Sequence, residues 1–142
     1  MKTLDWTTKA QTRAWVRSFL RELTRPCVVL LSGPLGAGKT QLVKWFLEDL
    51  GMNDTVSPTF AIHHSYEVKS GLIDHVDLYR LKSDEDLESS GFWDLFTQNQ
   101  GLVFVEWADR LPEDVWPAGW KKVFIRLEKL GEEGRRIHLD GG

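Results

Sequence analysis

Apolar side chains recur at helical spacing near the start of the chain. A helix is predicted there because these positions would share one face: Ala14, Trp15, Phe19 and Leu23. Thr8 is followed three residues later by Gln11, the pattern of a capping box, so the helix should begin beside Thr8. The segment Thr24-Arg25-Pro26 should end it, because proline interrupts helical hydrogen bonding.

The next apolar segment is continuous rather than periodic. Cys27–Ser32 begins with five consecutive apolar residues, which is the pattern of a central strand buried on both faces. A glycine-rich stretch, residues 33–38, follows directly. Helical spacing then returns before Gly51 and predicts a second helix through Val43, Phe46, Leu47 and Leu50.

The rest of the chain alternates predicted strands with short predicted helices. Strands are indicated at Phe60–Val68, Leu72–Val76, Leu102–Val105, Val123–Leu127 and Arg136–Leu139. Short helices are indicated after Ser83, where three acidic residues suit the positive end of a helix dipole, and around Phe92–Phe96. This order predicts one α/β domain over residues 1–142, with a mixed sheet, largely parallel at its core, and helices on both faces.

Composition narrows the classes of protein that fit. The 142 residues are 42% hydrophobic and 27% charged, as in an ordinary globular domain. No apolar run approaches the roughly 20 residues that span a bilayer, and no secretory signal is evident, so a cytoplasmic protein is expected. A net charge of −3 argues against a protein that coats DNA. Cys27 is the only cysteine and is expected to be a buried small side chain rather than a zinc ligand.

Residues 33–40 carry a motif with a direct chemical meaning. Gly33-Pro34-Leu35-Gly36-Ala37-Gly38-Lys39-Thr40 fits G-x-x-x-x-G-K-[ST], the phosphate-binding P-loop, between a predicted strand and a predicted helix. Its backbone amides and the helix N-terminus attract phosphate. Lys39 would reach the β- and γ-phosphates, and the Thr40 hydroxyl would ligate Mg²⁺. Nucleotide binding is therefore predicted.

A P-loop also needs an acidic residue for the metal at the end of a neighbouring strand. Glu106 follows the apolar run Leu102–Val105 and fits that position. Asp77 lies just past another predicted strand. Two acidic residues at strand ends allow Glu106 to hold Mg²⁺ while Asp77 orients or deprotonates water.

Four motifs in order resemble one family over essentially the whole chain. They are Gly33–Thr40, Ser57-Pro58-Thr59-Phe60, His75-Val76-Asp77-Leu78-Tyr79-Arg80 and Val105-Glu106-Trp107. The chain resembles the TsaE (YjeE) family, the bacterial ATPase component of tRNA threonylcarbamoyladenosine biosynthesis. Two positions depart from the family pattern, because Pro34 stands where aspartate is frequent and Asp109 where glutamate is common.

The resemblance implies a small Mg²⁺-dependent ATPase whose hydrolysis is slow without its partners. It implies two partner proteins that carry out threonylcarbamoyl transfer. We expect tRNA as an indirect partner, and no partnership with a membrane or with DNA. Thr40 and Glu106 would be metal ligands, and Asp77 the acid required for hydrolysis. Thr59 would sense the γ-phosphate in a switch-like loop, and Trp107 would pack beside the nucleotide.

Other functions remain alternatives. A small-molecule kinase shares the P-loop, although the chain has no arginine between Arg80 and Arg110 for a lid. A GTPase is disfavoured because neither D-x-x-G nor N-K-x-D occurs. A module that only binds nucleotide is the remaining alternative.

Two surface hypotheses also follow from the pattern of residues. Lys9, Arg13, Arg17 and Arg21 recur every four residues on the first predicted helix, so they form either a solvated face or a docking surface for tRNA or an acidic partner. Trp15 and Trp45 are expected in the core. For Trp93, Trp116 and Trp120 an exposed protein interface is the alternative to packing.

Overall fold

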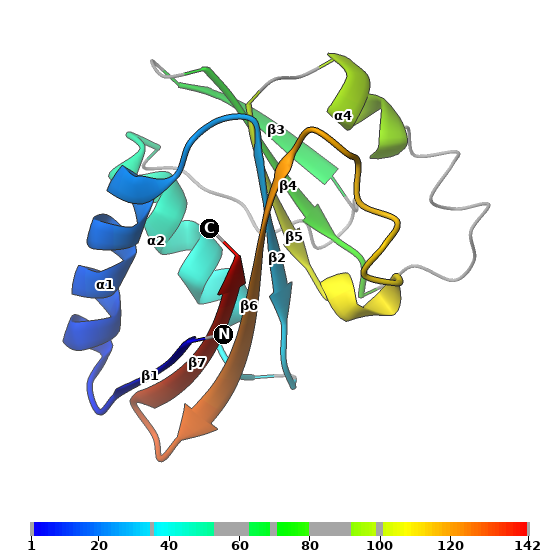
Figure 1. Ribbon diagram of the computed structural model, residues 1–142. Coiled ribbons are helices and arrows are strands. Elements are labelled where there is room, and N and C mark those ends of the chain that lie inside the picture. Colours follow the sequence, from blue (N-terminus) through cyan, green and yellow to red (C-terminus); the bar gives the residue numbers. More distant parts are fainter. Residues whose placement is uncertain are drawn as a thin grey trace.

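The computed structural model describes residues 2–34, 36–52, 63–68, 71–79, 92–98 and 101–141, arranged around one seven-stranded sheet (Figure 1). The strands are β1 (Lys2–Trp6), β2 (Cys27–Ser32), β3 (His63–Val68), β4 (Gly71–Asp77), β5 (Leu102–Glu106), β6 (Lys121–Leu130) and β7 (Gly134–Gly141). Their order across the sheet is β1-β7-β6-β2-β5-β4-β3. Strand β2 pairs in parallel with β5 and β6, and β4 pairs in parallel with β5. Antiparallel pairs lie at both edges, so the predicted mixed sheet with a parallel centre is confirmed.

Helices pack on both faces of the sheet, but unequally. The two longer helices, α1 (Lys9–Glu22) and α2 (Lys39–Asp49), share one face and one apolar core with β2, β5 and β6 (Figure 1). The other face carries a second core, into which the short η1 (Phe92–Asp94), α4 (Leu95–Gln98) and η2 (Ala108–Arg110) contribute side chains. The parallel centre is thus buried on both faces, as the apolar run Cys27–Ser32 predicts. No helix within the described ranges is long and apolar enough to cross a membrane.

Helix α1 begins where its sequence signals predict. The Gln11 amide donates to Thr8 Oγ1 at 3.3 Å, and the Thr8 amide donates to Gln11 Oε1 at 3.2 Å, so both halves of the capping box are present. Trp15 stacks on Phe19 with ring centroids 4.8 Å apart, and Trp45 packs against the same core. The expectation that Trp15 and Trp45 are packing residues is confirmed.

The basic residues that recur every four positions on α1 are not all free in solvent. Arg13 Nη1 donates to Asp49 Oδ2 at 2.6 Å and to the Trp45 carbonyl at 3.2 Å, and Arg13 Nη2 reaches Glu48 Oε2 at 3.3 Å. Arg17 lies 3.5 Å from Asp49 Oδ1. The acidic residues at the end of α2 therefore pair with two of these four basic residues, Arg13 and Arg17. This pairing is tertiary, which is why spacing within α1 alone did not indicate it.

The remaining differences concern strands and ranges. Strand β1 was not predicted, and β6 and β7 extend beyond the predicted Val123–Leu127 and Arg136–Leu139. The helix predicted after Ser83 and residues 60–62 of a predicted strand lie outside the described residues. Cys27 is fully buried in the core, as expected.

Candidate functional site

The loop between β2 and α2 is held by close main-chain packing. Gly33 follows β2 with φ +132°, and a Cβ atom there would lie 2.4 Å from the Leu127 carbonyl oxygen of β6. Gly38 precedes α2 in the left-handed region, with φ 102°. Glycine is required at both positions because a side chain would meet a strained backbone and, at Gly33, a neighbouring strand. The loop thus brings the N-terminus of α2 to the end of β2, the arrangement that favours anion binding.

Lys39, the first residue of α2, turns its side chain back over this loop. Its ammonium donates to the carbonyls of Gly33 and Pro34, at 2.6 and 2.9 Å, and lies 4.1 Å from the centre of the Trp107 ring. Only 5% of the residue is exposed. Burial lowers the pKa of Lys39, and the negative charges of Glu106 and Asp109 oppose that shift. A buried cation therefore lies over the loop.

Glu106 meets the loop from the neighbouring strand. It ends β5, is paired in register with Leu31 of β2, and is 1% exposed. Its Oε1 accepts a hydrogen bond from Thr40 Oγ1 at 2.6 Å, and its Oε2 lies 2.5 Å from Nε2 of His75 on β4. The hydroxyl and the carboxylate predicted to serve the metal are thus in direct contact.

Asp77 ends β4 beside Glu106, with which it is paired in register. Its Oδ1 accepts the backbone amide of Tyr79 at 2.9 Å, which fixes one carboxylate oxygen. Burial raises the pKa of Asp77, and the charge of Glu106 adds to the rise, whereas the Tyr79 amide, His75 and Lys39 oppose it. A carboxylate with a raised pKa is a stronger base than an ordinary aspartate.

The donor set suits a magnesium ion that is shared with phosphate. Within the described ranges no group of three His, Cys, Asp or Glu residues could hold a metal alone. Thr40 and Glu106 offer two oxygen donors, and Mg²⁺ is usually bound through one or two protein oxygens together with substrate phosphates and water. These residues therefore fit a Mg²⁺–nucleotide complex better than an isolated metal site.

Comparison with known proteins identifies the family. The model of the family described as threonylcarbamoyl adenosine biosynthesis protein TsaE matches residues 6–137. The chain belongs to the TsaE family. It is 35% identical over 140 residues to the "tRNA threonylcarbamoyladenosine biosynthesis protein TsaE" of Rickettsia conorii, covering 95% of this chain and 74% of that protein. The protein of the same name from Bacillus subtilis is 34% identical over 141 residues, covering 96% and 85%.

A solved structure extends the similarity to three dimensions. The crystal structure of YdiB from Bacillus subtilis superposes with a TM-score of 0.66 at 29% identity, covering 99% of this chain and 87% of that one. The fold of this TsaE-family chain is thus the α/β P-loop fold expected from its sequence.

Most of the predicted site residues of this TsaE-family chain come together at the carboxyl ends of β2, β5 and β4. Thr40 contacts Glu106, and Lys39 lies over the Trp107 ring. Asp77 is paired in register with Glu106, and the charge of Lys39 influences its pKa. Leu35 and Thr59 lie outside the described residues, as do Ser57–Phe60 and Arg80.

Two features of the site were not predicted. His75 lies against Glu106, a role that the alternation of β4 could have suggested, because His75 and Asp77 are two residues apart and share a face. Trp107 adopts φ 58°, a conformation uncommon for a bulky residue. The Lys39 ammonium lies over its ring, and the centre of the Tyr79 ring is 5.0 Å from the centre of the Trp107 ring.

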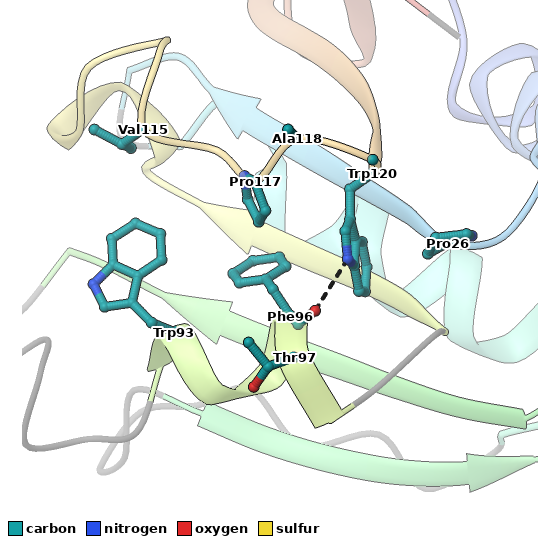
Figure 2. A pocket seen from close by; sticks show the side chains of 9 residues that line it. Pro26, Trp93, Phe96, Thr97, Val115, Pro117, Ala118 and Trp120 are labelled. Atoms are coloured by element: carbon teal, nitrogen blue, oxygen red, sulfur yellow. Dashed lines mark hydrogen bonds between the residues drawn. The ribbon is translucent and has the colours of Figure 1, made fainter.

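A hollow of about 500 Å³ lies at the opposite end of β2, and the described residues that line it include no charged side chain (Figure 2). Pro26, which precedes β2, lines it together with Trp93 and Trp120. The Trp120 indole N–H already donates to the Phe96 carbonyl at 3.2 Å. Trp116 and Trp120 are 4% and 6% exposed, and Trp93 packs against the same core while partly buried, so packing rather than an exposed cluster describes the three.

Proposed function

We propose that this chain binds ATP with Mg²⁺ and hydrolyses it slowly, as a subunit that works with two partner proteins in threonylcarbamoyladenosine modification of tRNA. The convergence of Lys39, Thr40, Glu106 and Asp77 at the loop after β2 carries the proposal of ATP hydrolysis. The names of its relatives, which specify tRNA threonylcarbamoyladenosine biosynthesis, support the cellular role.

Each residue has a definable part in this proposal. The bound nucleotide supplies the γ-phosphoryl group, and Mg²⁺ neutralises its charge. Lys39 exchanges its bonds to the Gly33 and Pro34 carbonyls for phosphate oxygens. Thr40 and Glu106 hold the cation, and Asp77 orients or deprotonates water. We assign to Thr59 the sensing of the γ-phosphate.

Binding and hydrolysis can be tested on the purified protein. Calorimetry with Mg-ATP should show binding, and phosphate should be released without any acceptor. Lys39→Ala should weaken binding by about 10- to 150-fold, because it removes charged hydrogen bonds of roughly 1.5–3 kcal/mol. Lys44→Ala, a lysine farther along α2, is the matched control and should bind normally. Turnover only with an added metabolite would instead indicate a kinase.

The cellular role needs a separate experiment. In a bacterial strain depleted of its own TsaE, this chain should restore threonylcarbamoyladenosine in tRNA, measured by mass spectrometry of digested tRNA. Lys39→Ala should not restore it, and Lys44→Ala should. A chain that hydrolyses ATP yet fails to restore the modification would contradict the assignment to this pathway.

A further inference from the structure

The carboxylate of Glu106 is held from two sides. It is buried, with 1% of the residue exposed, so each of its oxygens needs a hydrogen-bond donor. The Thr40 hydroxyl, on α2, donates a hydrogen bond to Oε1, and Nε2 of His75, on β4, is hydrogen-bonded to Oε2. An ionised carboxylate can only accept, so the His75 ring must donate through Nε2. The carboxylate is therefore oriented by one contact from a helix and one from a strand.

The two residues that contact Glu106 differ in whether they also have a proposed role in binding the cation. Thr40 is itself a proposed metal ligand, so its hydroxyl must serve the cation as well as Glu106. His75 is 1% exposed, and its Nε2 contact to Glu106 belongs to β4 rather than to the P-loop or the helix that follows it. The His75 contact can therefore persist unchanged whether or not a cation and a nucleotide are present.

We propose that His75 is a positioning residue, which fixes the orientation of the Glu106 carboxylate so that its Oε1 edge faces the cation beside Thr40. This inference rests on the proposed function, because it assigns a role in Mg²⁺ binding. Strand β4 then contributes twice to the site: Asp77 acts on water, and His75 orients the metal-binding carboxylate from the same face of the strand.

The proposal predicts a specific pattern of loss. Removing a residue that orients a metal ligand typically weakens metal binding by about 10- to 100-fold. ATP binding without metal depends on the loop amides and Lys39, whereas the contact described for the His75 side chain is with Glu106, so that affinity should not change. A purely structural histidine would show the opposite pattern, a loss of stability without a selective change in Mg²⁺ dependence.

The experiment measures ATP affinity by calorimetry in EDTA and then across a Mg²⁺ titration, for wild type and variants. His75→Phe keeps a ring but lacks the donor. His75→Gln and His75→Met are of similar size and differ in the donor, so this pair gives the same comparison if His75→Phe does not fold. Ile73→Ala, two residues earlier on the same face of β4, removes buried core volume without contacting Glu106 and is the packing control.

We expect His75→Phe and His75→Met to need about 10- to 100-fold more Mg²⁺ for half-maximal enhancement of ATP binding, with unchanged affinity in EDTA. His75→Gln should recover much of the loss, and Ile73→Ala should match wild type in both measurements. An unchanged Mg²⁺ requirement in folded His75→Phe or His75→Met, or equal losses in His75→Gln and His75→Met, would overturn the role of His75 alone. Failure of wild type to bind Mg-ATP would overturn the proposed function and this inference with it.

Discussion

Arg13 provides a quantitative test of how α1 is attached to α2. Its guanidinium makes a 2.6 Å contact to Asp49 and weaker contacts to Glu48 and the Trp45 carbonyl. The Arg13 and Asp49 side chains are only 23% and 14% exposed, so water screens this pair less than a surface ion pair. Arg17 lies 3.5 Å from the same Asp49 but is 64% exposed.

These geometries give different expected costs for the two arginines. A charge-assisted hydrogen bond contributes about 1.5–3 kcal/mol, and partial exposure reduces this, so Arg13→Ala should lower the free energy of unfolding by about 1–3 kcal/mol. Arg17→Ala should cost about 0–1 kcal/mol, as is usual for an exposed pair. At about 3 °C per kcal/mol, the Tm of Arg13→Ala should fall by roughly 3–9 °C.

Urea unfolding and thermal melts of the two variants measure this difference. A double-mutant cycle with Asp49→Ala should show that the two single losses are not additive, because both remove one interaction. Equal stabilities of Arg13→Ala and Arg17→Ala would refute the reasoning.

Three further predictions follow from the site and the core. Asp77→Asn should bind Mg-ATP normally but hydrolyse it about 100- to 10,000-fold more slowly. Because burial raises the pKa of Asp77, folding favours the protonated carboxyl, and the stability of the wild type falls as the pH rises through the interval above the ordinary value of 3.8. The variant has no carboxyl to ionise, so at pH 7 it should unfold at no lower temperature than the wild type. Equal losses of ATP binding and hydrolysis would argue against that division of roles. Burial raises the pKa of the Cys27 thiol to about 11, so a thiol reagent at pH 8 should label Cys27 only in denaturant, and rapid labelling of the native protein would contradict its burial. Gly33→Ala should destabilise the protein by about 2–4 kcal/mol in a denaturant titration, because its Cβ would meet the Leu127 carbonyl. Gly36→Ala should cost only about 1–2 kcal/mol, because Gly36 has φ +83° but no atom within 4 Å of the added Cβ. Similar costs for the two variants would show that the contact with β6 does not matter.

Much of the fold was predictable because its signals are local. The capping box of α1, the apolar run of β2 and the P-loop each occupy a few consecutive residues, and each forms where it was expected. Strand β1 is different, because it lies at the sheet edge and, among the described strands, pairs with β7 alone. Its five residues carry no continuous apolar run, and edge strands need none.

The candidate site was predictable in its residue types but not in its contacts. Spacing placed Glu106 and Asp77 at strand ends, and the structure pairs the two residues in register, where their charges influence the pKa of Lys39. The contact between His75 and Glu106 depends on the register of β4 against β5, which no local pattern specifies. The pairing of Arg13 with Asp49 depends similarly on how two helices pack. Such tertiary contacts require the folded chain.

The position of β1 has a consequence for synthesis on the ribosome. Lys2 pairs with Leu139, 137 positions later in the chain. At about 5–20 residues per second, translation leaves the first strand without its neighbour for roughly 7–27 s. By the time β7 is synthesised, the segments through β5, including the P-loop, are already complete. Although β1 precedes the other described strands in the chain, it is therefore among the last of them to join the sheet.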